Sequence, residues 1–184
     1  LRFLPYPELN VFFFFFQYST RIFDCNQYLV QILSLEEGLR REYTEFSDIP
    51  KEVIEAFIKA EDQHFYSHIG IDIGAIFRAT FQNVSNKTTI SGASTITMQL
   101  ARIISPSPTR NILAKGKEAL NALRLELRLS KDEILELYLN NLPFGFNTEG
   151  VTSAAKTFFG KELISLTKEE ILSLAVIPRR PQSY

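Results

Sequence analysis

Cysteine is nearly absent from this sequence, since Cys25 is the only one among 184 residues. A single thiol cannot form an internal disulfide, and it cannot build a zinc site made of thiolates. An excess of charge of one sign is lacking too, because 20 Lys and Arg residues face 21 Asp and Glu residues. With a formal net charge of -1, no global basic field can hold a nucleic acid, so any anion site must come from local clustering of cations. We therefore expect no nucleic acid partner.

The sequence also lacks an apolar run long enough to cross a bilayer. The run at residues 11–16 includes five consecutive phenylalanines but falls far short of the roughly 20 residues that a transmembrane helix needs. We interpret it as a core segment or as a place of shallow membrane contact. The chain begins with Leu1 rather than Met and ends in the loop-like residues 179–184, so we expect both ends to be cuts in a longer chain.

Hydrophobic periodicity predicts a mainly α-helical domain with a short strand element near its N-terminus. Residues 18–43 are strand-like around a turn-prone segment at residues 24–27, which predicts a hairpin. The first expected helix begins at Pro50 and ends near Glu61, and the second spans residues 73–83. A third begins at Thr95 and breaks at Ser105, and three more span residues 111–128, 131–141 and 168–176. Capping boxes are predicted for Ser130 with Glu133 and for Thr167 with Glu170. We divide the chain into a linker and strand segment, residues 1–47, and a catalytic-sized domain, residues 48–184.

Four segments carry more polar residues than packing alone would require, namely residues 61–70, 91–100, 115–118 and 134–140. The carboxylates of Glu61 and Asp62 are expected at a helix C-terminus, where the helix dipole disfavours negative charge, and this placement suggests a function. Cations between Ala101 and Lys131 outnumber acids, which indicates either a solvated helix face or a site for a phosphate or pyrophosphate group. A base that accepts a proton from a hydroxyl, together with cations that stabilise a pyrophosphate leaving group, would suit sugar-phosphate chemistry.

A histidine pair lies in the first of these segments. His64 and His68 are four residues apart, a spacing that can bind a metal on one helix face. No third ligand is placed near them, so we interpret His68 as a structural residue and predict no metal-binding side chain.

In this order and at these spacings, the four segments resemble the signature motifs of the family 51 glycosyltransferases, the polymerising domain of class A penicillin-binding proteins. Residues 19–24 and 140–145, with Met98 and Arg102, are most similar to the penicillin-binding protein 1C subgroup. The resemblance implies a lysozyme-like helical large lobe, a small membrane-facing lobe and a cleft for the glycan. It implies a peptidoglycan glycosyltransferase that polymerises lipid II into glycan strands with inversion and releases polyprenyl pyrophosphate.

The same resemblance implies where the protein acts and with what. The expected partners are lipid II, the growing glycan strand, the membrane surface and a transpeptidase domain fused in the full-length protein. The expected location is the bacterial inner membrane, with the catalytic domain on its periplasmic face. A divalent cation, Mg or Mn, is the only cofactor to consider.

Carried over by matched position, Glu61 is expected to be the general base. Glu118 would be the second glutamate, which helps the pyrophosphate to depart directly or through a divalent ion. The substrate-binding residues that the resemblance implies are Asp62, Phe65, His68, Ser94, Thr95, Thr97, Gln99, Arg102 and Lys115. Gly70 belongs to the first motif, and Asn140, Gly145 and Gly150 match later, more structural motifs. Ala114 stands where the third motif usually has arginine, which removes one expected phosphate contact.

Two other functions remain open from the sequence. A lytic glycosidase on the same lysozyme-like scaffold would also use paired carboxylates, but it has no need of phosphate-binding cations. An inactive, membrane-associated scaffold would keep the fold without the reaction.

Overall fold

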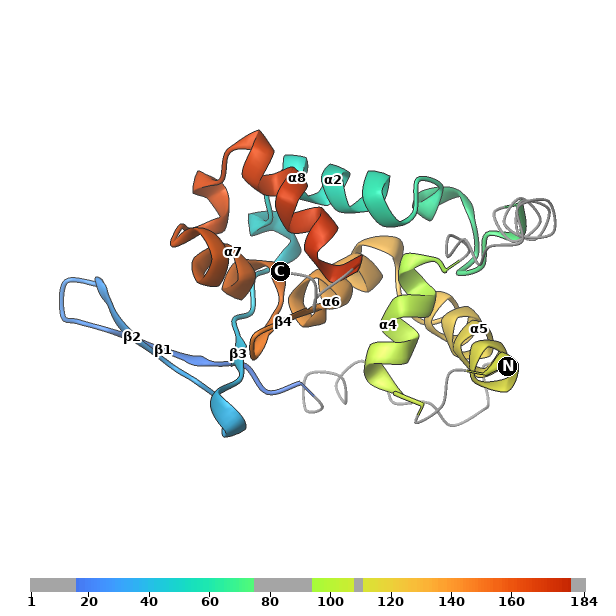
Figure 1. The fold of residues 1–184 in the computed structure, drawn as a ribbon, viewed down its shortest axis with the longest axis horizontal. Helices are drawn as coiled ribbons and strands as arrows, with labels where there is room; N and C mark the ends of the chain where they lie inside the picture. The colour runs from blue at the N-terminus through green and yellow to red at the C-terminus, as the bar shows by residue number, and fades with distance from the viewer. Residues whose placement is uncertain (1–15, 75–93, 108–110, 180–184) are drawn as a thin grey trace. The chain divides into compact units, whose positions relative to one another are not determined.

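The computed structural model describes residues 16–74, 94–107 and 111–179, and helices dominate this part of the chain (Figure 1). The helices are α2 (Lys51–Glu61), α4 (Ile96–Ile104), α5 (Ile112–Glu126), α6 (Lys131–Asn141), α7 (Val151–Phe159) and α8 (Lys168–Val176). Short 3-10 turns are η1 (Glu36–Gly38), η2 (Phe46–Asp48), η3 (Phe65–Ser67), η4 (Leu163–Ser165) and η5 (Ile177–Arg179). The strands are β1 (Thr20–Phe23), β2 (Leu29–Leu33), β3 (Arg40–Arg41), β4 (Pro143–Gly145) and β5 (Thr148–Glu149). The mainly α fold class is therefore confirmed.

Helix ends that depend on local side-chain bonds fall where the sequence predicts them. Thr167 and Glu170 form a complete capping box at α8, and Ser130 and Glu133 exchange the same pair of bonds at the start of α6. Thr95 caps α4 by accepting a hydrogen bond from the Met98 amide. Of the helix predicted at residues 73–83, residues 75–83 lie outside the described part.

The chain forms two compact units. The described part of the first unit lies within residues 57–135, and that of the second comprises residues 16–56 and 136–179. The boundary falls inside α2 and inside α6, because each of these helices contributes residues to both units. The division predicted between residues 47 and 48 stays a prediction.

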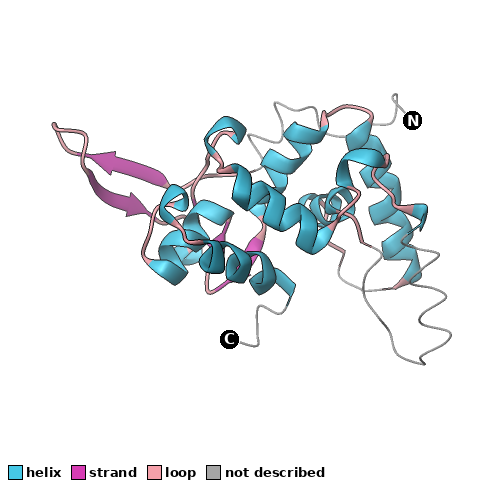
Figure 2. Cartoon of the chain, turned by 90° about the horizontal axis from the view of Figure 1, so that it is seen from above, coloured by secondary structure: helices cyan, strands magenta, loops and turns pink. Residues whose placement is uncertain are grey.

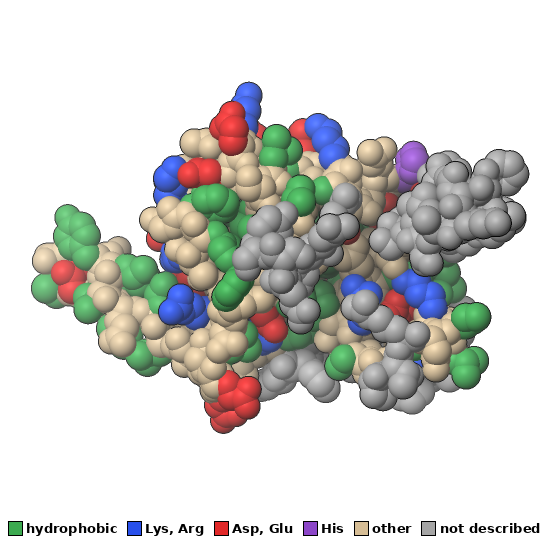
Figure 3. All heavy atoms as spheres, viewed as in Figure 1, with side chains coloured by type: hydrophobic (Ala, Val, Ile, Leu, Met, Phe, Trp, Pro, Cys, Tyr) green, Lys and Arg blue, Asp and Glu red, His purple; other side chains and the backbone are tan. Residues whose placement is uncertain are grey.

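The second unit contains all five described strands. β1 and β2 pair antiparallel as the predicted hairpin, with Thr20 opposite Leu33, and their apolar side chains are largely exposed (Figures 2 and 3). A separate sheet has the order β3-β5-β4, in which β3 is parallel and β4 antiparallel to β5. Phe16, next to β1, is buried and lies under the Arg41 guanidinium, so this phenylalanine is a core residue rather than a membrane contact. Residues 12–15 lie outside the described part.

A buried carboxylate and a buried amide organise the second unit. Glu42 is 2% exposed and accepts bonds from Arg21 at 2.6 Å and Lys156 at 2.8 Å. Asn140 brackets the backbone of Thr44, accepting from its amide and donating to its carbonyl. A Cβ at Gly150 would come within 2.5 Å of the Asn140 carbonyl oxygen, so only glycine fits there. These contacts agree with a structural role for the later motifs.

The first unit is built around α4, most of whose apolar residues are buried. Ile96 and Leu100 on α4, Leu125 on α5, and Phe57 and Phe65 around the end of α2 have no exposed surface. Because this interior is closely packed, the polar groups at its solvent-facing edge have few alternative arrangements. Of the predicted site residues, Glu61, Gln99 and Lys115 are partly exposed at that edge, whereas Phe65 and Thr97 belong to the buried interior.

Gly70 packs closely against helix α5 within the first unit. Its φ is +88°, and a Cβ added there would lie 2.9 Å from Glu126 Cγ and 3.1 Å from the Ala122 carbonyl oxygen, both on α5. We expect Gly70→Ala to lower the free energy of unfolding by about 2 kcal/mol through backbone strain and overlap. Gly116→Ala, with nothing within 4 Å of the added Cβ, should raise it by about 0.5 to 1 kcal/mol. Urea unfolding of both variants measures this, and an unchanged midpoint for Gly70→Ala would show that the close approach is absent.

Candidate active site

Glu61 is the last residue of α2, and its carboxylate meets a side chain from α4. The Gln99 side-chain amide donates a hydrogen bond to Glu61 Oε2 at 2.9 Å. Glu61 and Gln99 are both partly exposed, so this contact lies at the surface margin of the buried core. The first and second predicted motifs are therefore in direct contact, and Gln99 orients the predicted base.

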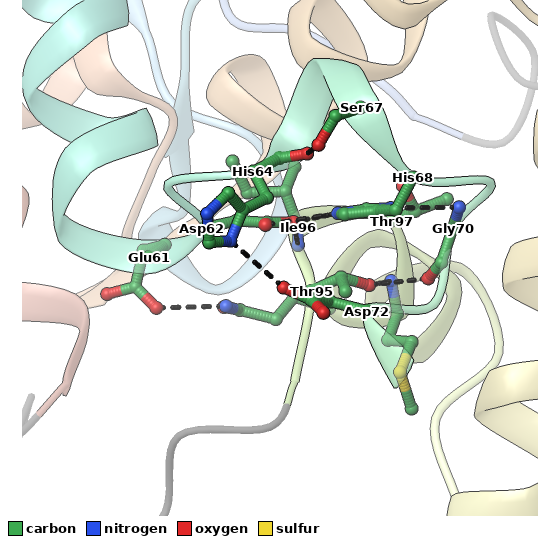
Figure 4. A network of polar contacts seen from close by, with 12 residues as sticks. Glu61, Asp62, His64, Ser67, His68, Gly70, Asp72, Thr95, Ile96 and Thr97 are labelled. Carbon is green, nitrogen blue, oxygen red and sulfur yellow. Dashed lines mark hydrogen bonds and ion pairs between the residues drawn. The ribbon is translucent and has the colours of Figure 1, made fainter. Parts of the chain in front are cut away.

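Asp62 takes part in the network of polar contacts that Figure 4 shows, and its side chain is only 4% exposed, whereas Glu61 is partly exposed. Asp62 Oδ2 accepts a bond from the Ile96 amide at 3.0 Å, at the N-terminus of α4. Its carboxylate also contacts His68 Nε2 at 2.9 and 3.0 Å. A carboxylate at a helix N-terminus satisfies amides that have no partner within the helix and is favoured by the helix dipole. Asp62 therefore joins the end of α2 to the start of α4, and its contact with a substrate stays a prediction.

His68 has both ring nitrogens engaged within the protein. The Gly70 amide donates to His68 Nδ1 at 3.0 Å, so Nδ1 acts as an acceptor. The ring proton must then be on Nε2, which donates it to Asp62. This arrangement supports the structural interpretation of His68.

Three further residues predicted to bind substrate are buried. Thr95 is 2% exposed and donates to the Gly70 carbonyl at 2.6 Å (Figure 4). Thr97 has no exposed surface and donates to Glu126 Oε1 at 2.6 Å. Phe65 likewise has no exposed surface. In this structure the three side chains pack or form hydrogen bonds inside the first unit, and the substrate contacts that the resemblance implies for them stay a prediction.

Glu118 and Lys115 form a second polar cluster on α5. Lys115 Nζ donates to Glu118 Oε2 at 2.9 Å and also to the Ser94 hydroxyl, just before α4. The Glu118 side chain is 13% exposed and that of Lys115 is 44% exposed, so the ammonium group is accessible while the carboxylate is largely covered. The second and third predicted motifs thus meet at Ser94, with a cation at the surface.

The predicted basic stretch is only partly available to an anion. Lys131 is paired with Glu126 at 2.7 Å, and Arg124 donates to Asn121 on its own helix at 3.1 Å. Arg102 lies exposed in the last turn of α4. The stretch is therefore a mixture of structural cations and surface cations, a distinction that counting charges along the sequence cannot make.

Tyr66 is not a competing base for Glu61. Partial burial, the hydrogen bond from its hydroxyl to Asp132 at 3.0 Å and the charge of that carboxylate raise the pKa of Tyr66 to about 12. The phenol therefore stays protonated at neutral pH, where it can donate but not accept a proton.

The residues around Glu118 do not form a metal centre by themselves. Among the described residues, no group of three or more His, Cys, Asp or Glu side chains could hold a metal ion. Glu118 offers one carboxylate, and the Lys115 ammonium beside it opposes a second cation. A divalent ion would have to take most of its oxygen ligands from a substrate and from water.

Two pockets of the second unit involve none of the predicted site residues. One, of about 890 Å³, is lined by both polar and apolar residues, among them Glu52 and Leu163, and the other, of about 550 Å³, is lined mainly by apolar residues such as Phe158 and Leu172. The cleft that the resemblance implies stays a prediction.

Comparison with known proteins agrees with the motifs. The sequence profile of a family described as Transglycosylase matches residues 27–184. Penicillin-binding protein 1A of Haemophilus influenzae is 44% identical over 144 residues, which cover 78% of this chain and 17% of that protein. Penicillin-binding protein 1F of Bacillus subtilis is 41% identical over 166 residues, which cover 90% of this chain and 23% of that protein. A crystal structure of the Haemophilus influenzae protein covers 90% of this chain and 14% of its own, with a TM-score of 0.39 and 24% identity, a likeness too weak to argue from.

The chain belongs to the transglycosylase family, which confirms the family and the class of enzyme predicted from its motifs, a transglycosylase. These two relatives are 1A and 1F proteins, so the 1C subgroup stays a prediction. The chain spans about a fifth of the length of these relatives, between 17% and 23%.

Sequence reasoning missed one residue that contacts much of the first unit. Glu126, on α5, is bonded to Thr97 and Lys131, and its Cγ lies close to Gly70. The sequence offered only a weak signal, a Glu and a Lys five residues apart across the break between two predicted helices.

Proposed function

We propose that this domain polymerises lipid II into glycan strands, with Glu61 as the general base. The observation that carries the proposal is the pairing of Glu61 with Gln99 in the same unit as the Ser94, Lys115 and Glu118 cluster. Family membership supports the reaction class.

The proposed step is a single displacement. Glu61 accepts the proton of the 4-hydroxyl of the acceptor sugar, and the oxygen forms a bond to the anomeric carbon of the donor. The bond from that carbon to the pyrophosphate oxygen breaks, and the electron pair leaves with the polyprenyl pyrophosphate. Attack from the face opposite the leaving group inverts the anomeric centre. Lys115 and Glu118 would act at the leaving group, where negative charge accumulates.

Incubation of the protein with fluorescent lipid II in detergent tests this function. We expect a ladder of β-linked glycan, made from the α-linked donor, and release of polyprenyl pyrophosphate. A lytic glycosidase would instead shorten preformed glycan without any lipid-linked substrate. An inactive scaffold would give neither product.

Lys115 and Lys117 form a matched pair for testing the proposed phosphate contact. Both are lysines on α5, but Lys115 contacts Ser94 and Glu118, whereas Lys117 is exposed. We expect Lys115→Met to raise the KM for lipid II about tenfold or more, because a charge-assisted contact with a phosphate is lost. Lys117→Met should change the KM by less than about twofold. Steady-state polymerisation kinetics of both variants measure the difference, and equal effects would remove Lys115 from the site.

The setting of the reaction is part of the same proposal. The relatives' names and lengths support a longer class A penicillin-binding protein in which a transpeptidase domain accompanies this one. Among the described residues, no helix is long and apolar enough to span a membrane. We propose attachment to the periplasmic face of the inner membrane because the polyprenyl tail of lipid II stays in the bilayer. The apolar side chains considered for that contact are Ile76, Phe77, Phe81, Ile90 and residues 12–15, all outside the described part.

The divalent cation, Mg or Mn, also stays a proposal. Glu118 would be the protein group that holds it, and it would supply neutralisation of the charge on the leaving pyrophosphate. No step of the proposed mechanism depends on it.

A further inference from the structure

Glu126 binds two helices at once and contacts the loop that follows Glu61. Its Oε1 accepts from Thr97 on α4 at 2.6 Å and from Lys131 at the start of α6 at 2.7 Å. The Glu126 side chain is 11% exposed and that of Lys131 is 19% exposed, so water screens this pair only weakly. Charge-assisted bonds of this kind are short and directional.

The pair of Glu126 and Lys131 also contacts the loop after Glu61. Lys131 Nζ lies 4.6 Å from the centre of the Phe65 ring, within reach of a cation–π interaction. Gly70, at the other end of the loop, packs against Glu126 Cγ. One carboxylate thus contacts α4 and α6 directly, and reaches both ends of the segment from Phe65 to Gly70.

The position of Thr97 on α4 explains how the contacts of Glu126 can affect Glu61, the predicted base. Successive helix residues turn by about 100°, so Thr97 and Gln99 point to nearly opposite sides of α4. The start of α4 is held by Asp62 and by the bond from Thr95 to Gly70. The bond from Thr97 to Glu126 adds a contact on the side away from Gln99, and so it sets the rotation of α4 about its axis. That rotation determines where the Gln99 amide meets Glu61.

We propose that Glu126 is a positioning residue for glycosyl transfer, acting through Thr97 to aim Gln99 at the Glu61 carboxylate. The inference rests on the proposed function, because it concerns the same base. It places Glu126 away from the substrate and predicts an effect on turnover rather than on binding.

Glu126→Gln removes the charge without removing volume. Both bonds already end on Oε1, so the amide oxygen of the glutamine must serve Thr97 and Lys131 without the negative charge of the carboxylate, and both bonds weaken. We expect kcat to fall about tenfold or more with KM within about twofold, because a small displacement of an aligned group slows chemistry without weakening binding. Glu133→Gln is the matched control, since Glu133 is an exposed glutamate in the first turn of α6 and glutamine can still complete its capping box. A kcat for Glu126→Gln equal to that of Glu133→Gln would overturn the proposal.

A double-mutant cycle separates positioning from substrate contact at Thr97. If Thr97 acts through Glu126, Thr97→Val combined with Glu126→Gln should lose no more activity than the more damaging single variant. Thr97→Ser, which keeps the hydroxyl, should restore most of the activity lost in Thr97→Val. If the fractional losses of activity in the two single variants instead multiply in the double variant, the two residues act independently and the proposed action of Glu126 through Thr97 is refuted. Should Glu126→Gln fail to fold, the comparison of Thr97→Val with Thr97→Ser still decides, because equal activities would contradict the proposal.

A spectroscopic measurement is independent of the reaction. The side-chain amide resonances of Gln99 should shift in Glu126→Gln and stay in place in Glu133→Gln, in spectra of the folded ¹⁵N-labelled protein without substrate. Failure of the wild-type chain to make polymer, with these shifts present, would count against the proposed function and not against the positioning. Polymer synthesis with unshifted Gln99 resonances would count against the positioning alone.

Discussion

Glu61→Gln is expected to reduce polymerisation below about 1% of the wild-type rate, since general base catalysis contributes roughly 10²- to 10⁴-fold. The amide is nearly isosteric, and its oxygen can still accept the hydrogen bond from Gln99. The substitution therefore keeps the local contact and removes only the ability to accept a proton at neutral pH. Initial rates with fluorescent lipid II, at matched concentrations of folded protein, provide the measurement.

Glu55→Gln is the control for this prediction. Glu55 is an exposed glutamate on the same helix, α2, so the two variants change the net charge equally. We expect Glu55→Gln to keep activity within about twofold of wild type, as is usual for surface substitutions. Retention of more than about 1% of the activity by Glu61→Gln, with an unchanged circular dichroism spectrum, would rule out Glu61 as the base.

Local sequence features predicted five of the six described helices, all except α7, and those predictions succeeded because their causes are local. Capping side chains act within one turn, so Thr95 and Thr167 mark helix starts that can be identified from a few residues. The same is true of Glu61 at the end of α2, where the apolar period stops. The order of the four motifs then identified the family without any tertiary information.

Pairings between distant segments were beyond local reasoning. Sheet β3-β5-β4 joins Arg40 to Thr148 across more than half of the chain, and two-residue strands carry almost no periodic signal. Only the β1–β2 hairpin, whose strands are neighbours in sequence, was expected. Residues 143–145, just after the helix predicted at residues 131–141, form β4, a strand that the sequence analysis did not predict.

The sequence also did not indicate which face of α5 is buried. The apolar stripe at residues 112, 113, 120, 123 and 127 predicts the helix correctly, but Ile112 and Leu113 are 90% and 82% exposed. Burial falls instead on Asn121, Ala122 and Leu125. Periodicity reports that a helix is amphipathic, whereas neighbouring elements decide which side is covered.

The site residues divide in the same way. Motif matching grouped Asp62, Thr95 and Thr97 with residues that contact substrate, and in this structure their side chains are buried and hydrogen-bonded to protein groups. Chemical type and spacing are identical for a hydroxyl that contacts a substrate and one that supports a helix. Only the three-dimensional partners distinguish the two roles.

Glu118→Gln is expected to lower kcat about 10²-fold or more while leaving the KM for lipid II within about threefold. Glu118 is 13% exposed and accepts from Lys115 at 2.9 Å, a bond that the glutamine oxygen can keep. The ground-state contacts of the cluster are therefore largely preserved. The loss would appear only when negative charge builds on the departing pyrophosphate, since a carboxylate can share a proton or a cation there and an amide cannot.

The leaving group provides the sharpest test of this role. A donor whose leaving group is more acidic needs less assistance to depart, so it should lose less turnover in Glu118→Gln than lipid II does. Glu133→Gln serves as the control for the change in charge, and its single-turnover rates with both donors should equal those of the wild type. Single-turnover rates with the two donors measure the ratio. An equal loss for both donors, or a loss confined to affinity, would mean that Glu118 holds the substrate in place and does not assist pyrophosphate departure.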